Sequence, residues 1–351
     1  MPWRRRIDLA TDILRANLGE RSLPYKLTFA LTGRCNARCA LCGIWRQPPN
    51  PDELSLAEIT AFLTRNDHFS WIDLTGGEIV LREDVAEIVR AVLASQRRLF
   101  HLHVPCNGID VEATARLVGV VREAAEPPPL FTLTISLDGP AALHDRLRGH
   151  AGNWESCMAL YERLRPMCHG GFRLFFGFTL SHLNVGQLQA TVRAAQERLP
   201  GLAIEAFHLN LAHASEHYYH NTQREWPLRM PEGFREEIAW FARSRRGFPD
   251  AVGLIEKRYL RYALRYVESG RTPVPCQAMA SSIFVAADGV CYPCTLWNRP
   301  LGNLRDYDFR LPPLLAANGA ARQAVREEAC PRCWSPCEAN PSLLARLARL
   351  P

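Results

Sequence analysis

The chain has 351 residues, of which 47% are apolar and 22% are charged, and its formal net charge is +6. This composition supports a large core, and because no run of 18 apolar residues occurs, we expect no membrane partner. The arginines are scattered over predicted helices, without a basic patch that carries interleaved aromatic residues, so nucleic acid is not an expected partner either.

The cysteines point to metal binding in a reducing compartment. The basic N-terminus is followed by acidic residues rather than by the apolar segment of a secretory signal, which predicts a cytoplasmic protein. In that compartment the twelve cysteines are more typical of metal ligands than of disulfides. Nine of them fall in two groups, residues 35–42 and 276–337, while Cys106, Cys157 and Cys168 lie outside both and are typical of small buried residues.

Strand and helix patterns alternate along most of the chain. Residues 1–25 are predicted to hold one short helix, over residues 7–18, which Gly19 ends. Apolar runs and helical patterns then follow one another at the spacing of successive strand–helix units. A capping box at residues 55–58 starts one of the helices, and Asp110, Asn153 and Asn184 are interpreted as N-caps of others. The predicted strands are residues 27–32, 71–75, 99–104, 131–137, 172–180 and 203–209.

This alternation predicts an α/β fold with a parallel sheet and helices outside it. Because six units are too few for an eight-fold barrel, we expect a partial (β/α)6 TIM-like barrel over residues 26–270, with helices after its sixth strand. The composition changes near Arg271, so residues 271–351 are predicted to form a cysteine-rich extension. In it, Asp288 and Gly289 are expected to turn a β-hairpin that presents a cysteine, and residues 341–351 to form a short helix and tail.

The most informative motif follows the first predicted strand. Cys35, Cys39 and Cys42 lie within eight residues at a C-x3-C-x2-C spacing. Clustered thiolates in one loop are typical ligands of iron–sulfur clusters. Three thiolates would leave one iron of a [4Fe-4S] cluster free to bind another molecule. A zinc site or a disulfide is the alternative interpretation.

Polar residues follow the other predicted strands as well. Because active sites of such barrels form at the carboxyl ends of the strands, we expect these residues to share one mouth with the cysteine loop. They are Gly76-Gly77-Glu78 after the second strand, Cys106-Asn107 after the third, Ser136 and Asp138 at the fourth, and Asn184 after the fifth.

The three-cysteine loop and Gly76-Gly77-Glu78 together resemble the radical S-adenosylmethionine (radical SAM) superfamily, over about residues 26–210. Two positions depart from the family pattern: Leu41 stands where an aromatic residue is frequent, and Ile79 where proline is frequent. Neither removes a ligand. The resemblance implies that the free iron binds S-adenosylmethionine (SAM) and that its reductive cleavage gives a 5′-deoxyadenosyl radical, which abstracts hydrogen from a substrate. It further implies an electron donor of flavodoxin or ferredoxin type.

The resemblance also implies roles for the mouth residues. The glycines of Gly76-Gly77-Glu78 would let the backbone approach SAM without a Cβ in the way, and the glutamate would accept a hydrogen bond from the SAM ammonium group. Ser136 and Asp138 would bind the ribose, although Asp138 is equally typical of a turn. Asn184 is either a SAM ligand or a helix N-cap, and Asn107 either a turn residue or a site residue.

A second resemblance covers the C-terminal cysteines, which are similar to the SPASM/Twitch extension of some radical SAM enzymes. It implies an auxiliary [4Fe-4S] cluster. Because six thiols fill one cluster with two to spare, we favour one cluster, with Cys291 as a substitute for Cys294 and Cys337 as a substitute for another ligand. Two incompletely ligated clusters or a zinc ribbon are the alternatives. The favoured ligands are Cys276, Cys294, Cys330 and Cys333.

Histidines and tyrosines gather after the sixth predicted strand. Such side chains near a mouth can act as general bases or meet a substrate, whereas in most loops they pack or face solvent. We take His213 and Tyr218 as candidate catalytic residues, and Cys106 as a third candidate because a thiol can donate a hydrogen atom. The group consists of His208, His213, His217, His220, Tyr218 and Tyr219.

The predicted function is that of a radical SAM oxidoreductase or maturase, which oxidises a small molecule such as a sugar or cyclitol or modifies a peptide. Residues 1–25 are too few for a leader-binding domain, which favours a small molecule or a peptide that a separate protein recognises. One alternative is a radical SAM epimerase or a peptide maturase with external leader recognition. Another is a non-catalytic iron–sulfur or zinc scaffold, or an electron carrier.

Overall fold

The structure is a computed structural model that describes residues 2–18, 23–223, 232–246, 251–327, 330 and 332–348. Gly19, the predicted end of the first helix, lies outside these ranges. The strands are β1 (Lys26–Ala30), β2 (Trp71–Thr75), β3 (His101–Cys106), β4 (Leu130–Ser136), β5 (Phe172–Leu180), β6 (Phe207–Leu211), β7 (Ser282–Val285), β8 (Val290–Tyr292) and β9 (Gly302–Asn303).

Helices separate most of the strands, and short 3-10 turns lie between them. None of the described helices is both long and apolar enough to cross a membrane. The α-helices are α1 (Pro2–Leu18), α2 (Leu56–Arg65), α3 (Val85–Ser95), α4 (Val111–Arg122), α5 (Ala141–Arg148), α6 (Asn153–Leu164), α7 (Leu188–Arg198), α8 (Phe234–Ser244), α9 (Ala251–Ser269), α10 (Leu311–Ala317), α11 (Gly319–Arg326) and α12 (Pro336–Leu347). The 3-10 turns are η1 (Ile44–Arg46), η2 (Ile79–Leu81), η3 (Arg165–Met167), η4 (Ile204–Ala206) and η5 (Leu304–Tyr307).

The strands of the described chain form one sheet in the order β6-β5-β4-β3-β2-β1-β7-β8-β9. From β1 to β6 the neighbours are parallel and follow the chain order, as successive strand–helix units require. β7 pairs with β1 in parallel, and β8 and β9 continue the sheet in antiparallel fashion. The predicted partial barrel is confirmed, and the C-terminal region extends its sheet.

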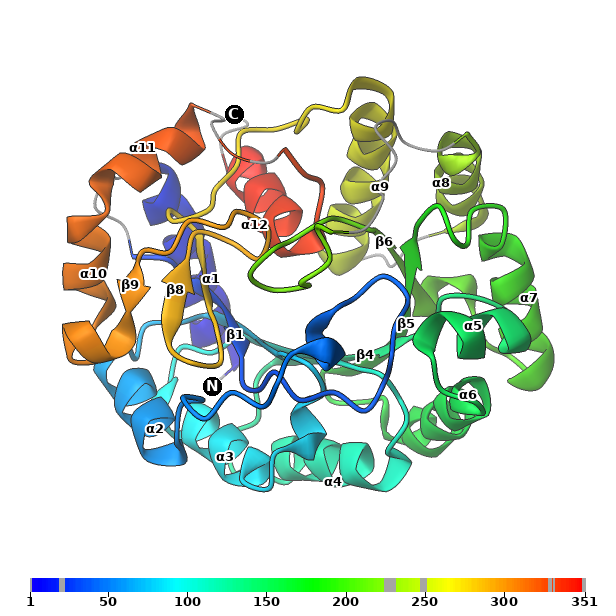
Figure 1. The fold of residues 1–351 in the computed structure, drawn as a ribbon, viewed down its shortest axis with the longest axis horizontal. Coiled ribbons are helices and arrows are strands. Elements are labelled where there is room, and N and C mark those ends of the chain that lie inside the picture. Colours follow the sequence, from blue (N-terminus) through cyan, green and yellow to red (C-terminus); the bar gives the residue numbers. More distant parts are fainter. Residues whose placement is uncertain are drawn as a thin grey trace.

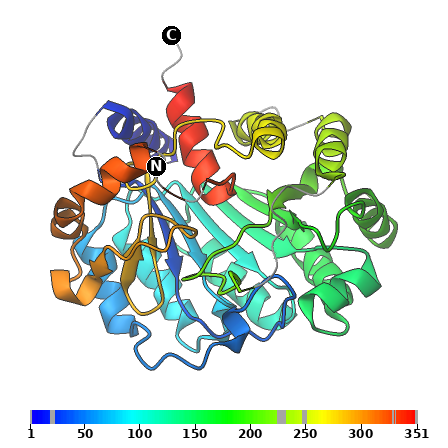
Figure 2. The ribbon, with the colours of Figure 1, turned by 45° about the horizontal axis from the view of Figure 1, so that its top comes forward.

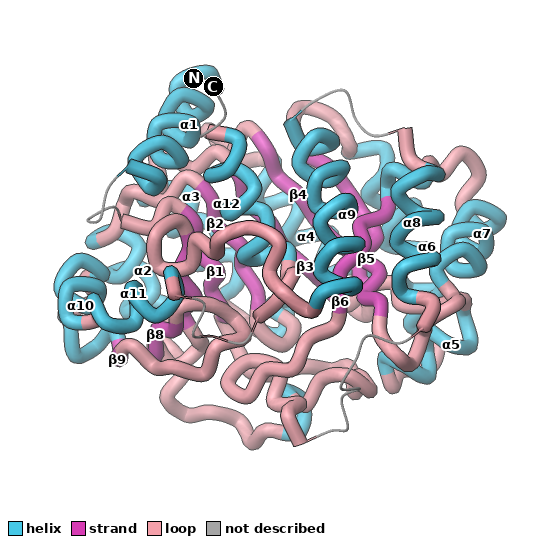
Figure 3. Tube along the Cα trace, turned by 90° about the horizontal axis from the view of Figure 1, so that it is seen from above, coloured by secondary structure: helices cyan, strands magenta, loops and turns pink. Residues whose placement is uncertain are grey.

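Two groups of helices enclose the sheet from opposite sides. In Figure 1, α2, α3, α4, α6 and α7 follow the outside of the curved sheet, whereas α9 and α12 lie across its open side. A hydrogen bond of 2.6 Å from Lys26 Nζ to the carbonyl of Cys337 ties α12 to β1, and a contact between His208 and Glu256 ties α9 to β6. Figure 3 shows these two helices lying over the strands. A space is thus closed off between the inner face of the sheet and these two helices.

The alternation of residues along the strands decides what faces this space. Leu102 and Val104 of β3 enter the core beneath the outer helices, while His101 and His103 face the inner cavity. The core between the sheet and the outer helices is apolar and contains aromatic contacts: the rings of Phe29 and Phe62 meet edge to face with centroids 5.6 Å apart. The inner face is therefore the polar one, which suits it to bind ligands.

Several local predictions are confirmed. The side chains of Ser55 and Glu58 form the predicted capping box at the start of α2, and Asp110 caps α4 by accepting a hydrogen bond from the backbone of Ala113. The predicted hairpin turns at Gly289, between β7 and β8.

Other predictions are wrong in detail. The predicted strand at residues 203–209 begins as the 3-10 turn η4, and β6 follows it. The last helix begins at Pro336, before the predicted residues 341–351, because Pro336 suits a first helical turn. Asn153 is the first residue of α6 rather than its N-cap, and Asn184 lies before α7, whose N-cap is Gln187.

Candidate active site

A cavity of about 540 Å³ lies between the sheet and helices α9 and α12. The structure brings the cysteine loop and the ends of β2 and β4 together at its mouth, as predicted. Glu78 and Asn184 stand behind the lining rather than in it. The predicted site residues that line the cavity are Cys35, Cys39, Cys42, Gly76, Gly77, Cys106, Ser136, Asp138, His213 and Tyr218.

The cysteine loop is held in place through its backbone. The N–H of Ala40 donates to the carbonyl of Leu147 at 2.7 Å, at the end of α5, and the N–H of Gly43 donates to the carbonyl of Tyr219 at 2.7 Å. Figure 2 shows the loops after β1 and β6 meeting at this end of the strands. The loop is thus fixed by segments that are distant in sequence, while its thiols stay free to bind.

Two thiols of this loop, those of Cys35 and Cys42, are neutral as long as no metal is bound. Burial raises the pKa of Cys35 to about 11 and that of Cys42 to about 12. Since metal ligands must be thiolates, the positive charge of a bound iron cluster would have to stabilise their ionised form. Within the described ranges, no three His, Cys, Asp or Glu side chains already gather around a position for a single ion. Three half-buried thiols in one loop at the mouth fit a cluster with one free corner.

Gly76 and Gly77 have a different neighbour from the predicted one. A Cβ on Gly76 would lie 2.3 Å from the carbonyl oxygen of Thr32, and a Cβ on Gly77 would lie 2.1 Å from that of Arg34. Gly76 also has a φ of 142°, which side chains rarely permit. The glycines therefore make room for the start of the cysteine loop, which bonds to the N–H groups of Gly77 and Glu78 at 2.8 Å. A direct contact of this backbone with SAM stays a prediction.

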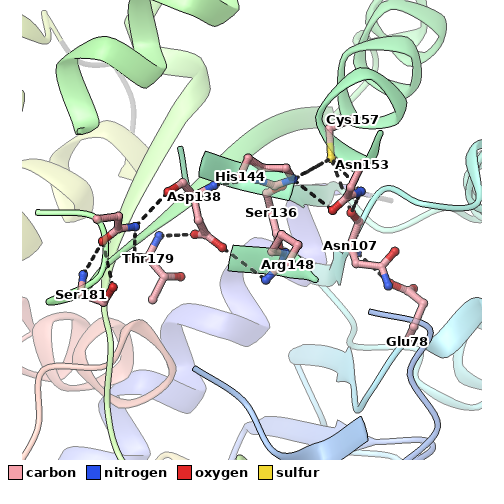
Figure 4. A network of polar contacts seen from close by, with 11 residues as sticks. Glu78, Asn107, Ser136, Asp138, His144, Arg148, Asn153, Cys157, Thr179 and Ser181 are labelled. Carbon is pink, nitrogen blue, oxygen red and sulfur yellow. Dashed lines mark hydrogen bonds and ion pairs between the residues drawn. The ribbon is translucent and has the colours of Figure 1, made fainter. Parts of the chain in front are cut away.

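Glu78 is buried beneath the mouth. Its Oε2 atom accepts a hydrogen bond of 2.7 Å from the N–H of Asn107, while its Oε1 atom is buried without a partner (Figure 4). Burial raises the pKa of Glu78 to about 7. An orphaned carboxylate oxygen of this kind fits a site that receives a cationic group, such as the ammonium group of SAM.

A buried network connects Glu78 with the end of β4. Asn153 donates to the carbonyl of Asn107 at 2.9 Å and its Oδ1 atom is 3.0 Å from Nε2 of His144, whose Nδ1 atom accepts from the N–H of Asp138 at 3.1 Å (Figure 4). Burial lowers the pKa of His144 to about 4, so the ring is neutral and its two nitrogens have opposite roles. Asn153 belongs to this network, which is why it does not cap its helix.

Asp138 and Asn184 fix the ends of β4 and β5. Asp138 accepts from the N–H of Thr179 at 2.9 Å and pairs with Arg148 at 3.3 Å. Asn184, which is 1% exposed, donates to the carbonyls of Asp138 and Thr179 at 3.0 Å and accepts from Ser181. Its amide is therefore used within the protein, so a direct SAM contact is not supported by this geometry.

The predicted catalytic candidates lie around the cavity. The hydroxyl of Tyr218 is 2.7 Å from Thr75 Oγ1, and Cys106 is buried at the end of β3. Nε2 of His213 is buried without a partner, and burial lowers the pKa of this side chain to about 4. By contrast, His217 donates to the carbonyl of Cys294 at 3.0 Å and stacks on Tyr292, so it supports the C-terminal hairpin.

Sequence reasoning missed two residues that support the cysteine loop. Gly149 ends α5 with a left-handed backbone, and a Cβ there would lie 2.5 Å from the carbonyl oxygen of Arg38. Arg148, next to it, is largely buried, which lowers its pKa, but the negative charges of a thiolate at Cys39 and of Asp138 would hold that pKa above its usual value. The Arg148-Gly149 pair is a recognisable helix end in the sequence, but the sequence does not show that this helix end contacts the cysteine loop.

The C-terminal cysteines lie around a second, much smaller cavity. Cys276, Cys294 and Cys333 share it with Cys330, and Glu338 and Trp334 complete part of its wall. Burial raises the pKa of Cys333 to about 12 and those of Cys276 and Cys294 well above the usual range. The space measures only about 20 Å³, so the four thiols would have to turn apart as a cluster enters. Four thiols from three segments of the chain fit a fully ligated cluster.

The two substitute ligands lie elsewhere. Cys291 is 0% exposed, and its Sγ atom points toward the carbonyl of Gly289 at 3.9 Å within the core. Cys337, in the first turn of α12, lines the large cavity instead. The geometry thus favours the predicted four-thiol set without either of them.

Comparison with known proteins agrees with this geometry. Residues 29–194 match the sequence profile described as the radical SAM superfamily. The chain is 24% identical over 291 residues to the sporulation killing factor maturation protein SkfB of Bacillus subtilis (strain 168), covering 80% of this chain and 63% of that protein. It is 26% identical over 183 residues to the pre-heme d1 synthase of Dinoroseobacter shibae, covering 51% of this chain and 41% of that enzyme.

Residues 29–194 of this chain thus carry the match to the radical SAM superfamily. Solved structures agree with the fold: Streptococcus suis SuiB bound to SAM aligns with a TM-score of 0.53 at 12% identity, over 78% of this chain and 60% of SuiB. The structure titled native anSMEcpe with bound AdoMet and Cp18Cys peptide aligns with a TM-score of 0.54 at 15% identity, over 82% of this chain and 80% of that one. The chain thus spans less than two thirds of SkfB and of SuiB.

Radical SAM enzymes use SAM and a [4Fe-4S] cluster as cofactors. Both cysteine groups fit clusters by the chemistry and burial of their thiols, and the orphaned oxygen of Glu78 fits the cation of SAM.

Proposed function

We propose that this radical SAM enzyme oxidises a peptide side chain and passes the resulting electron to an auxiliary cluster. The observation that carries this proposal is the position of the two cavities on either side of the first turn of α12. Pro336 and Cys337 line the large cavity, and the next residue, Glu338, lines the small one. An electron leaving a substrate in the large cavity would therefore have a short covalent and hydrogen-bonded path to the second group of thiols.

The roles of the residues follow from their positions. Cys35, Cys39 and Cys42 hold the cluster at the mouth, which with SAM supplies a radical that takes a hydrogen atom from the substrate. Glu78 receives the ammonium group of SAM, and Ser136 and Asp138 face its ribose. Arg148 keeps a positive charge beside the thiolates and holds Asp138 in place.

The auxiliary site is assigned to Cys276, Cys294, Cys330 and Cys333, because these four share the small cavity. Complete ligation by thiols leaves no corner for a substrate, which suits electron transfer rather than binding. This is why oxidation is favoured over epimerisation, which returns a hydrogen atom and needs no electron acceptor.

The peptide class rests on the relatives. One solved structure holds SuiB with the precursor peptide SuiA, another holds anSMEcpe with a Cp18Cys peptide, and SkfB is named as a maturation protein. A small polar molecule is the second candidate. It is supported by the cavity volume of about 540 Å³, within the roughly 300–1,000 Å³ of small-molecule sites, and by the polar side chains of the inner face.

The test uses anaerobically reconstituted enzyme with SAM, a reductant and two probe sets: synthetic peptides whose cysteine or serine is deuterated at Cβ, and polyols deuterated on carbon. We expect 5′-deoxyadenosine that carries deuterium, together with a peptide product that has lost one deuterium and one hydrogen atom. An oxidised polyol would favour the small-molecule candidate instead. With unlabelled peptide in D2O, a product that has only exchanged one hydrogen for solvent deuterium would indicate an epimerase. No 5′-deoxyadenosine at all would indicate a carrier, so both results contradict the proposal.

A further inference from the structure

A histidine, a glutamate and an arginine form a chain of contacts on the wall of the large cavity formed by β6 and α9. Nδ1 of His208, in β6, lies 2.7 Å from Oε1 of Glu256, in α9. The other carboxylate oxygen of Glu256 pairs with Arg245. His208 and Glu256 both line the cavity, and none of the roles assigned above uses them.

The contacts with Glu256 and Arg245 fix the tautomer of His208. The side chain of Arg245 is 4% exposed and that of Glu256 is 9% exposed, and Arg245 also donates to the carbonyls of Glu205 and Phe207. Held in this way, Glu256 is an acceptor, so Nδ1 of His208 carries the ring proton and Nε2 keeps its lone pair. Among the described residues Nε2 has no hydrogen-bond partner, and the side chain is 25% exposed toward the cavity.

The sheet register places this lone pair at the level of the mouth. His208 is the register partner of Gly177 in β5, which is in turn the partner of Ser136 in β4. Gly177 has no side chain that would stand between them; a Cβ there would lie 2.8 Å from Thr134 Cγ2. The space between Ser136 and His208 is therefore open along this row.

A second histidine in the cavity provides a contrast. His103 also lies beside a carboxylate, with Nδ1 3.4 Å from Asp73, but its Nε2 atom is already 3.1 Å from the hydroxyl of Thr134. Both of its ring nitrogens are occupied by the protein. His208 thus offers an open ring nitrogen, whereas His103 serves as part of the wall.

We propose that Nε2 of His208 accepts the proton that the substrate loses from a hydroxyl, amine or thiol group during its oxidation, with Glu256 and Arg245 as positioning residues. The inference rests on the proposed oxidative function. For a hydroxyl-bearing carbon, the C–H hydrogen atom goes to the SAM-derived radical, one electron goes to the auxiliary cluster, and the O–H proton goes to His208. Two electrons and two protons leave in total, and a C=O bond forms.

The first test measures the open nitrogen without any substrate. Diethyl pyrocarbonate acylates unprotonated histidine nitrogens. The reconstituted holoenzyme without SAM is therefore treated at about pH 8, well above the ordinary histidine pKa of about 6.5. The modified sites are mapped by mass spectrometry. We expect His208 to react several-fold faster than His103, and Glu256→Gln to slow His208 because the tautomer is no longer fixed. His208 reacting no faster than His103, or unchanged by Glu256→Gln, overturns the inference.

The second test measures the proton transfer. His208→Gln should keep its iron content and its substrate-independent SAM cleavage, and should still move deuterium from the probe peptide into 5′-deoxyadenosine. The yield of oxidised product per 5′-deoxyadenosine should fall about 100-fold, the low end of general base contributions. His169→Gln, on an exposed histidine far from the cavity, is the matched control and should match the wild type.

The two proposals fail in different ways. A wild-type enzyme that cleaves SAM but oxidises no probe contradicts the oxidative function, whereas the diethyl pyrocarbonate result still decides whether His208 presents an open nitrogen. A wild-type enzyme that oxidises the probe, with His208→Gln equally productive, overturns the role of His208 alone.

Discussion

The two groups of thiols differ in how the chain brings them together. Cys35, Cys39 and Cys42 come from one loop and lie at the mouth of a large cavity, whereas the four C-terminal thiols come from three segments and line a small one. A loop of three ligands leaves a corner for an outside molecule, while four converging ligands close the site. The proposed function assigns the radical chemistry to the first region and electron transfer to the second, and the predictions below test this division.

The largest expected effect separates the two regions by activity. Cys39→Ala should abolish reductive SAM cleavage, because the loop loses one of three ligands at the mouth. Cys333→Ala should retain SAM cleavage and lose turnover of the probe peptide, because only the acceptor site is damaged. Both are measured as 5′-deoxyadenosine and product by mass spectrometry. Equal loss of SAM cleavage in the two variants would remove the division of roles.

The next effect concerns which C-terminal thiols hold iron. Cys294→Ser should lose about four irons per chain, the content of one [4Fe-4S] cluster, because this thiol lines the small cavity. Cys291→Ser should keep them, because Cys291 points into the core near Gly289. Iron and sulfide analysis after anaerobic reconstitution measures both. Loss of iron in the Cys291 variant alone would show that Cys291, and not Cys294, is the ligand.

A smaller effect tests the link between the two regions. Nζ of Lys26 is buried between Asp73, at 2.9 Å, and the carbonyl of Cys337, at 2.6 Å, so it joins β1 and β2 to α12. Lys26→Met should lower the free energy of unfolding by about 3–5 kcal/mol, because it leaves the charge of Asp73 buried without its lysine counter-charge. Urea titration of the cofactor-free protein measures this value.

The double variant Lys26→Met with Asp73→Leu is the control for this prediction. It removes the isolated charge, so it should recover much of the lost stability. If the double variant has a lower free energy of unfolding than Lys26→Met alone, the buried charge of Asp73 is not the cause of the lost stability.

The smallest effect is the pH dependence that Glu78 contributes. Burial raises its pKa from 4.5 to about 7, so below pH 4.5 the carboxyl is protonated in both folded and unfolded chains. Between pH 4.5 and 7 only the unfolded chain ionises, so the folded state loses stability, by about 3 kcal/mol in total at 1.36 kcal/mol for each pKa unit.

The comparison variant is Glu78→Gln, which cannot ionise. In cofactor-free protein, its stability advantage over the wild type should grow from pH 4.5 to pH 7 and stay constant above that. Urea unfolding at a series of pH values measures the difference. Parallel pH profiles for the two proteins would show that Glu78 ionises as readily in the fold as in the unfolded chain.

The local features of this molecule were predictable from its sequence. The C-x3-C-x2-C spacing, the capping box at Ser55 and the alternating strand patterns each depend on residues close together in the chain, and the mouth follows from where the strands end. The four-thiol set was also predicted, from its resemblance to a known extension, and the structure places these thiols around one cavity.

Features that depend on distant contacts were not predictable. The pairing of β7 with β1 depends on the return of the chain after α9. β7 has only four residues, too few for an alternating pattern that would reveal its partner. Asn153 and Asn184 resemble N-caps in sequence, yet each is used by a buried network that joins separate strands. The glycines at 76 and 77 serve the cysteine loop, which only the approach of its backbone could show.

The central claim is that SAM binds directly to the free corner of a cluster held by Cys35, Cys39 and Cys42. Electron–nuclear double resonance on the reduced holoenzyme, with SAM labelled by ¹⁷O in its carboxylate, tests this claim directly. The account predicts a ¹⁷O hyperfine coupling that disappears in Cys39→Ala and persists in Cys333→Ala. A reduced cluster at the mouth that shows no coupling to labelled SAM would contradict it.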